Sequence, residues 1–164
     1  MKQKIFYCKS WFRAKKKPID MWEEKKAIKK HKEGEPYTVL IGSDSSPSCF
    51  ISVTKNAGWV SVSFLDSELR EYLLYSFKLL KDNILFLSMA VYREFAKNDG
   101  EGEGILNVSC GTTYIFNEDG TTVVREERFN PHILEESQTM ADVSGNYDHF
   151  PQFGCYESLI KIER

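Results

Sequence analysis

The sequence is poor in the features that mark secreted or membrane-spanning chains. It has four cysteines in 164 residues, Cys8, Cys49, Cys110 and Cys155, and no C-x-x-C pair. It therefore lacks the dense disulfide framework of small secreted domains. Its longest strongly apolar run spans 8 residues, 84–91, whereas a membrane-spanning helix needs about 20. The basic N-terminal segment has no continuous apolar region of the kind found in secretory signals. We therefore expect a cytoplasmic protein with free thiols and no membrane partner.

Motifs for catalysis and for cofactors are also scarce. The chain has three histidines, no G-x-S-x-G elbow and no glycine-rich phosphate loop of standard spacing. Cys155 follows His149 by six residues, which is more typical of a packed thiol than of a nucleophile with its base. Neither this pair nor His132 has zinc-ligand spacing, and the acidic loop 99–103 lacks the spacing of a calcium loop. We expect no enzymatic activity, no cofactor and no metal.

From residue 37 onward the sequence alternates with a period near two and is rich in β-branched and aromatic residues, which predicts strands. Seven segments show this pattern: 37–43, 49–55, 58–65, 71–80, 83–95, 105–116 and 121–129. Short links join them, including a strong hairpin signal at Asp119-Gly120. Short links between consecutive strands predict an antiparallel meander.

The remaining segments complete the expected fold. Residues 4–12 suit a first strand, and 19–32 suit a short amphipathic helix capped by Asp20. Residues 131–148 are polar and are expected to be irregular. The run 83–91 is apolar on both faces, so we expect a central strand covered by the core on one side and by the helix or a second sheet on the other. The prediction is a single domain, 1–164, of the mainly β class with a minor α+β component. In it the meander forms a curved sheet or partial barrel, and one N-terminal helix packs against it.

Charge is distributed unevenly along the chain. Residues 1–36 contain 12 basic and 5 acidic residues, a net charge of +7, whereas residues 37–164 contain 10 and 19, a net charge of −9. An acidic body attracts basic proteins and repels phosphate backbones, so it disfavours nucleic acid as a partner. The lysine-rich N-terminal segment, with Trp11, Phe12 and Trp22 interleaved, leaves single-stranded nucleic acid as an alternative.

Acidic and aromatic residues in three segments, 99–103, 117–127 and 135–157, are the candidates for binding a basic partner protein. Aromatic side chains anchor protein interfaces, and peripheral carboxylates steer association. Glu126 and Glu127 are neighbours on one predicted strand and should point to opposite faces. The candidate residues are Asp99, Glu101, Glu103, Glu118, Asp119, Glu126, Glu127, Glu135, Glu136, Asp142, Tyr147, Asp148, Phe150, Phe153 and Tyr156.

The last fifth of the chain, GNYDHFPQFGCYESLIKIER, resembles immunity proteins of bacterial contact-dependent growth inhibition and related polymorphic toxin systems. The acidic meander and the basic N-terminal helix that precede it add to the resemblance. The residues that carry it are Asn146, Tyr147, Phe150, Pro151, Phe153, Gly154, Tyr156, Glu157, Ser158 and Leu159.

The resemblance implies a cytosolic inhibitor that binds a cognate toxin domain, often a nuclease, and covers its active site. An acidic surface suits this role, because nuclease clefts are basic in order to hold phosphates. The alternative is a small-ligand-binding β-barrel, since a long meander can enclose an apolar cavity.

Overall fold

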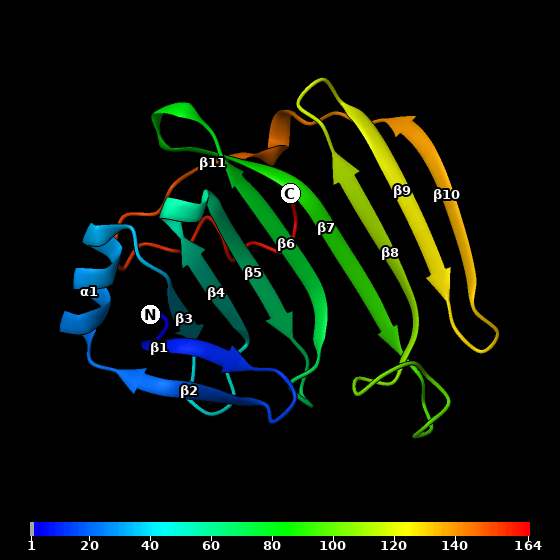
Figure 1. The fold of residues 1–164 in the computed structure, drawn as a ribbon, viewed down its shortest axis with the longest axis horizontal. Helices are drawn as coiled ribbons and strands as arrows, with labels where there is room; N and C mark the ends of the chain where they lie inside the picture. Colours follow the sequence, from blue (N-terminus) through cyan, green and yellow to red (C-terminus); the bar gives the residue numbers. More distant parts are fainter. Residues whose placement is uncertain (1) are drawn as a thin grey trace.

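The computed structural model describes residues 2–164, and its dominant feature is one large antiparallel sheet (Figure 1). Within these residues 11 strands form the sheet, with ten in the order β10-β9-β8-β7-β6-β5-β4-β3-β1-β2 and β11 paired with β7. The sheet ends at β2 on one side and at β10 on the other. The predicted mainly β fold with an antiparallel meander, a curved sheet and one α-helix is confirmed, and the sheet does not close.

The elements follow one another with short connections. They are β1 (Ile5–Phe12), β2 (Lys17–Trp22), α1 (Glu24–Glu33), β3 (Tyr37–Ile41), β4 (Cys49–Thr54), β5 (Trp59–Leu65), β6 (Glu71–Leu79), β7 (Ile84–Phe95), β8 (Val108–Phe116), β9 (Thr121–Arg128), β10 (Ile133–Met140) and β11 (Tyr147–His149), with single 3₁₀ turns at Lys55–Ala57, Lys81–Asn83 and Ser144–Asn146. All seven strands predicted from residue 37 onward are present as β3 to β9.

The helix predicted at 19–32 is present, but its predicted beginning is wrong. Its beginning belongs to β2, which pairs with β1, and α1 begins only at Glu24. Asp20 is not a helix cap; it lies within β2 with a φ of 50°, and the helix begins after Glu23 without a side-chain capping bond. Hairpin pairing with β1 satisfies the backbone of this segment, so tertiary context overrides the weak helical pattern.

The prediction of an irregular stretch at 131–148 is also wrong. Eight of these residues form β10, which pairs in unbroken register with β9, and Tyr147 begins the short strand β11. β11 pairs with the beginning of β7, and β8 pairs with the remainder of the same edge of β7.

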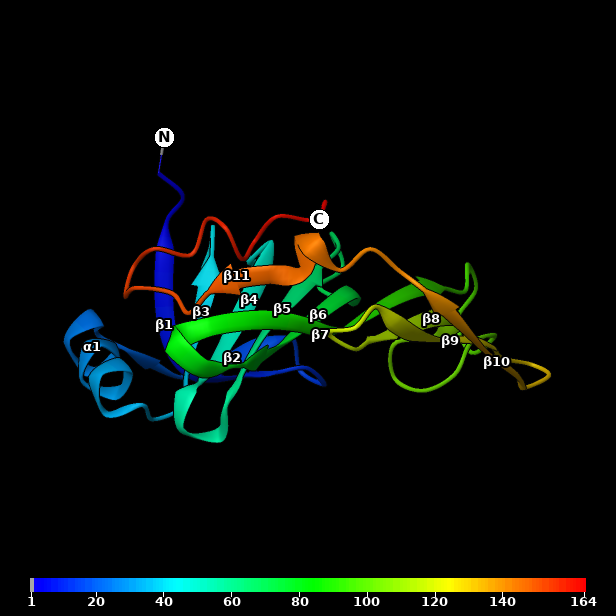
Figure 2. The same ribbon diagram turned by 90° about the horizontal axis from the view of Figure 1, so that it is seen from above.

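The C-terminal segment covers the apolar face of the sheet. Val60, Val62 and Phe64 of β5 point into the core, as the alternation predicted. Tyr156 and Leu159, which are 1% and 0% exposed, pack against them from the tail. Figure 2 shows this tail running above the strands, with α1 at one end of the sheet. The cover over the apolar face is therefore a non-regular segment, whereas we expected the helix or a second sheet.

A chain of hydrogen bonds fixes the tail to the helix and the sheet. His31 Nδ1 lies 2.8 Å from the Tyr37 hydroxyl, which lies 3.3 Å from the Tyr156 hydroxyl. Phe150 of the tail stacks on the ring of His31, and Phe153 meets the same ring edge-on. Burial raises the pKa of Tyr37 to about 12. Burial, with a smaller effect of nearby Lys55, lowers the pKa of His31, so the folded state favours a neutral imidazole.

On the opposite face, a second small core surrounds Trp11, Leu40 and Phe50. Beside it Glu71 is 5% exposed and accepts hydrogen bonds from Arg13 Nη2 at 3.1 Å and Arg93 Nη1 at 2.6 Å. Burial alone would raise the pKa of Glu71, but the Ser63 hydroxyl and the two guanidinium groups together lower it. The buried carboxylate thus joins the β1–β2 hairpin, β6 and β7.

The four cysteines form no disulfide; Cys8 and Cys49 are buried, Cys110 is half-buried and Cys155 is exposed. The expectation of a packed thiol at Cys155 is therefore wrong. In residues 2–164, no helix has the length and apolar character needed to cross a membrane.

The lowered pKa of His31 predicts a pH-dependent stability. An unfolded histidine titrates near pH 6.5, so the unfolded chain binds a proton there that the folded protein resists. The stability contributed by neutral His31 is complete above about pH 6.5 and is lost as the pH falls toward the folded-state pKa. Urea unfolding at several pH values between about 7.5 and 5.5 should show this decline.

The matched variant is His31→Asn, which keeps a polar atom near the Tyr37 hydroxyl but does not titrate. It should show a smaller loss of stability over the same pH range. An equal decline in both proteins would contradict the assignment to His31.

Candidate protein-binding surface

Strands β8 to β10 form a three-stranded extension, residues 108–140, that we call the wing. Figure 2 shows it projecting beyond the part of the sheet that the tail covers. Every residue of β8 is half-buried and every residue of β10 is exposed. Ile133, Leu134 and Met140 are 47%, 50% and 67% exposed. Exposed apolar side chains on an uncovered sheet are a feature of binding surfaces.

Local sequence explains why the wing folds without a covering layer. Asp119 accepts a hydrogen bond from the Thr121 N–H at 2.9 Å, and Gly120 takes a φ of 91° that favours glycine. The Gly120 N–H donates to the Asn117 carbonyl at 2.9 Å, and its own carbonyl accepts from the Ala141 N–H at 2.9 Å. This turn connects β8 to β9, and its bond to Ala141 also ties it to the end of β10.

One face of the wing holds two carboxylates in direct opposition. Glu126 of β9 pairs with Glu135 of β10 and, on its other side, with Thr112 of β8. Neither glutamate belongs to any of the ion pairs that residues 2–164 form. Like charges directly opposite in a sheet are destabilising. This arrangement lowers the stability of the fold, and a cation placed between the two carboxylates would remove the repulsion.

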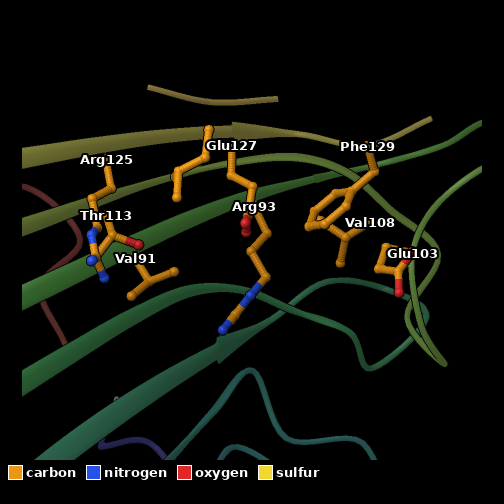
Figure 3. A pocket seen from close by; sticks show the side chains of 10 residues that line it. Val91, Arg93, Glu103, Val108, Thr113, Arg125, Glu127 and Phe129 are labelled. Carbon is orange, nitrogen blue, oxygen red and sulfur yellow. The ribbon is translucent and has the colours of Figure 1, made fainter. Parts of the chain in front are cut away.

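The other face of the wing contains a hollow of about 310 Å³ where β7, β8 and β9 meet (Figure 3). Val91, Val108, Phe129 and Leu134 provide its apolar walls. Glu127 points to this face and Glu126 to the opposite one, as expected for neighbours on a strand.

The cations around the hollow are already paired, whereas its carboxylates are not fully neutralised. Arg93 is bound to buried Glu71, and Arg125 Nε lies 2.7 Å from Glu136 Oε2. Glu127 contacts only His132, at 2.7 Å, and a histidine neutralises it only when protonated. Glu103 also borders the hollow and forms none of the ion pairs in the described chain. The hollow thus combines apolar walls with two carboxylates and with two arginines that are already engaged in ion pairs.

The two acidic loops lie at opposite ends of the wing. The 99–103 loop lies beside the β9–β10 turn, where Asn130 Nδ2 donates to the Glu101 carbonyl and Glu103 pairs with Val108. Asp99 and Glu101 are exposed there. Glu118 and Asp119 are exposed in the β8–β9 turn. Nine of the proposed partner-binding residues therefore lie on the wing or in the loop beside it, spread from one end to the other: Asp99, Glu101, Glu103, Glu118, Asp119, Glu126, Glu127, Glu135 and Glu136.

The other six proposed residues lie away from the wing strands. Asp142 is exposed in the link that leaves β10, and Tyr147 pairs with Phe86 at the start of β7. Asp148 holds Arg164 at 3.2 Å, and both side chains are nearly buried. The remaining aromatics, Phe150, Phe153 and Tyr156, pack into the core beneath the tail. Tyr156 is 1% exposed and has no surface to offer a partner, whereas Phe150 and Phe153 are half-buried.

Sequence reasoning missed the apolar residues of the wing and Arg93. Ile133 and Leu134 open the segment ILEESQTM, which has no alternation of apolar and polar residues. The useful signal was the β-rich strand 121–129 followed by a turn containing Pro131, which implies a returning strand.

The histidines and the cysteine that were weighed for catalysis or zinc binding, His132, His149 and Cys155, belong to no metal-binding cluster in the described residues. No group of three His, Cys, Asp or Glu side chains in residues 2–164 is arranged to hold a metal ion. His132 contacts Glu127, and Cys155 is exposed on the tail.

The opposed glutamates generate a prediction about stability. Glu135→Lys replaces a repulsive cross-strand pair with an attractive one, so the free energy of unfolding should rise by about 0.2–1 kcal/mol at low salt. Urea unfolding measures this change directly. The control is Glu35→Lys, at an exposed acidic residue between α1 and β3 that forms none of the ion pairs in the described chain. A gain of the same size in both variants would attribute the effect to net charge alone.

Comparisons of the chain with protein-family models, with curated proteins and with solved structures found no match.

Proposed function

We propose that the chain is a cytosolic immunity protein that binds a basic toxin domain, such as a nuclease, through the wing and covers its active site. The observation that carries the proposal is the opposition of Glu126 and Glu135 on an uncovered face. A soluble surface needs charge, but it gains nothing from placing like charges in the same cross-strand pair. A partner's lysine or arginine placed between them would turn the repulsion into attraction.

The shape and charge of the wing suit a protein partner. Both of its faces are accessible, carboxylates occupy both loops, and exposed Ile133, Leu134 and Met140 supply apolar contact area. Apolar contacts surrounded by polar groups are the usual organisation of an interface. The carboxylates would speed association with a basic domain and confer a dependence on salt.

The alternative of a ligand-binding barrel loses its main support in this geometry. That function needed a sheet that encloses a cavity, whereas this sheet ends at two separate edges.

The proposal predicts that an open reading frame for a large secreted protein lies immediately upstream of the gene, and the experiment uses the C-terminal domain of that protein as the toxin. Cells that express this domain should survive when they co-express the wild-type protein. Glu126→Lys/Glu135→Lys should fold yet protect poorly, because it reverses both opposed carboxylates. In vitro, its association rate should fall and lose much of its salt dependence.

Glu35→Lys/Glu163→Lys is the matched control, because it makes the same change of net charge at exposed sites outside the wing. It should protect as well as the wild-type protein. Full protection by the wing variant would overturn the proposed surface, and the absence of an upstream toxin would overturn the immunity function.

A further inference from the structure

The two edges of the sheet are built differently. At one edge, β2 contains Pro18 and bears Lys17, and Asp20 interrupts it with a φ of 50°. Proline, lysine and irregular backbone are the devices by which proteins prevent another strand from adding to an edge. At the other edge, β10 has eight residues in continuous register with β9 and contains no proline, glycine or lysine; its only charges, Glu135 and Glu136, repel an acidic strand but not a basic one.

The hydrogen bonds at either end of the β9–β10 hairpin show which backbone groups of β10 are unpaired. The Ala141 N–H donates to the Gly120 carbonyl at 2.9 Å, so residue 141 faces β9. At the other end the Phe129 N–H donates to the Ser109 carbonyl at 3.1 Å and faces β8. Backbone groups alternate in direction along an antiparallel strand. It follows that the N–H and C=O groups of Leu134, Glu136, Gln138 and Met140 point outward from the sheet edge.

We infer that the partner adds a β-strand to β10 and continues the sheet. This inference rests on the proposed function and specifies how the partner is held. Four residues with unpaired backbone groups supply the hydrogen bonds of a further strand, which is a known mode of peptide recognition. The backbone of the added strand would provide affinity. Its side chains would be selected by the β10 side chains that lie directly opposite them in the sheet.

Those β10 side chains define the chemistry of the added strand. Opposite Glu135 it carries lysine or arginine, because that position extends the row of Glu126 and Glu135. Glu135 directs its backbone toward β9, so its new neighbour forms the closer, non-hydrogen-bonded type of pair. Opposite Ile133 and Leu134 it carries apolar side chains, because both are about half exposed. Glu135 and Glu136 favour a basic segment over the β10 strand of a second copy, which would bring the same two carboxylates to the edge.

The test is amide hydrogen exchange measured by NMR on the full chain, with a blocked synthetic peptide designed to place Lys opposite Glu135 and Val or Thr opposite Ile133 and Leu134. In the protein alone, the amides of Leu134, Glu136, Gln138 and Met140 should exchange freely. The peptide should slow these four by about tenfold or more. A peptide with Glu in place of Lys should not. Protection without any peptide, together with a dimeric mass, would overturn the inference by showing a second copy at the edge. Unchanged exchange at saturating Lys peptide would also overturn it.

Variants at Gln138 separate this inference from the proposed function. Gln138→Pro removes an outward N–H and no bond to β9, so the fold should tolerate it. Binding of the upstream toxin domain should weaken about tenfold or more, whereas Gln138→Ala, which keeps the N–H, should bind as the wild-type protein does. If Glu126→Lys/Glu135→Lys loses binding but Gln138→Pro does not, the acidic surface stands and strand addition fails. If neither variant loses binding, both fail.

Discussion

The fold depends on how far the C-terminal tail reaches across the sheet. A sheet with an apolar face must cover it, and here a non-regular segment does so by burying Tyr156 and Leu159 against β1 to β7. Hydrogen bonds from His31 through Tyr37 hold this segment, and Arg164 fixes its end by bonding to Asp148 and lying 4.7 Å above the ring of Phe77. The strands under the tail bury their apolar side chains in a conventional core. The strands beyond it, β8 to β10, have no covering segment and form no such core.

This limit explains the composition of the wing. Residues of β9 and β10 are largely polar because nothing covers them, and pairing between strands provides most of their order. The unpaired glutamates, the half-exposed Leu134 and the regular edge of β10 occur together in this region. Each of them lowers stability or solubility by itself. Their coincidence at one place favours a role in binding over chance.

The sequence predicted strands well where one face of the strand is buried, and it did not predict strands that are exposed on both faces. The alternation of Val60, Val62 and Phe64 identified β5 because one of its faces enters the core. β10 was missed for the opposite reason: a strand with no buried face has no hydrophobic period to detect. β2 was misread because proline and an aspartate in a left-handed conformation disguise its pairing with β1. Among the candidate site residues, the acidic ones could be chosen from charge alone. Phe153 and Tyr156 could not be assigned, since an aromatic residue serves a core and an interface equally well.

The position of the covering segment also governs when the protein can fold during synthesis. Strands β1 to β7 leave the ribosome long before residues 150–160 do, and until then their apolar face has no cover. A sheet face formed by β1 to β7 would therefore stay exposed until the last part of the chain emerges, and exposed apolar surface in an incomplete fold is prone to aggregation. Completion of the fold is thus a late event, triggered by the arrival of one short segment.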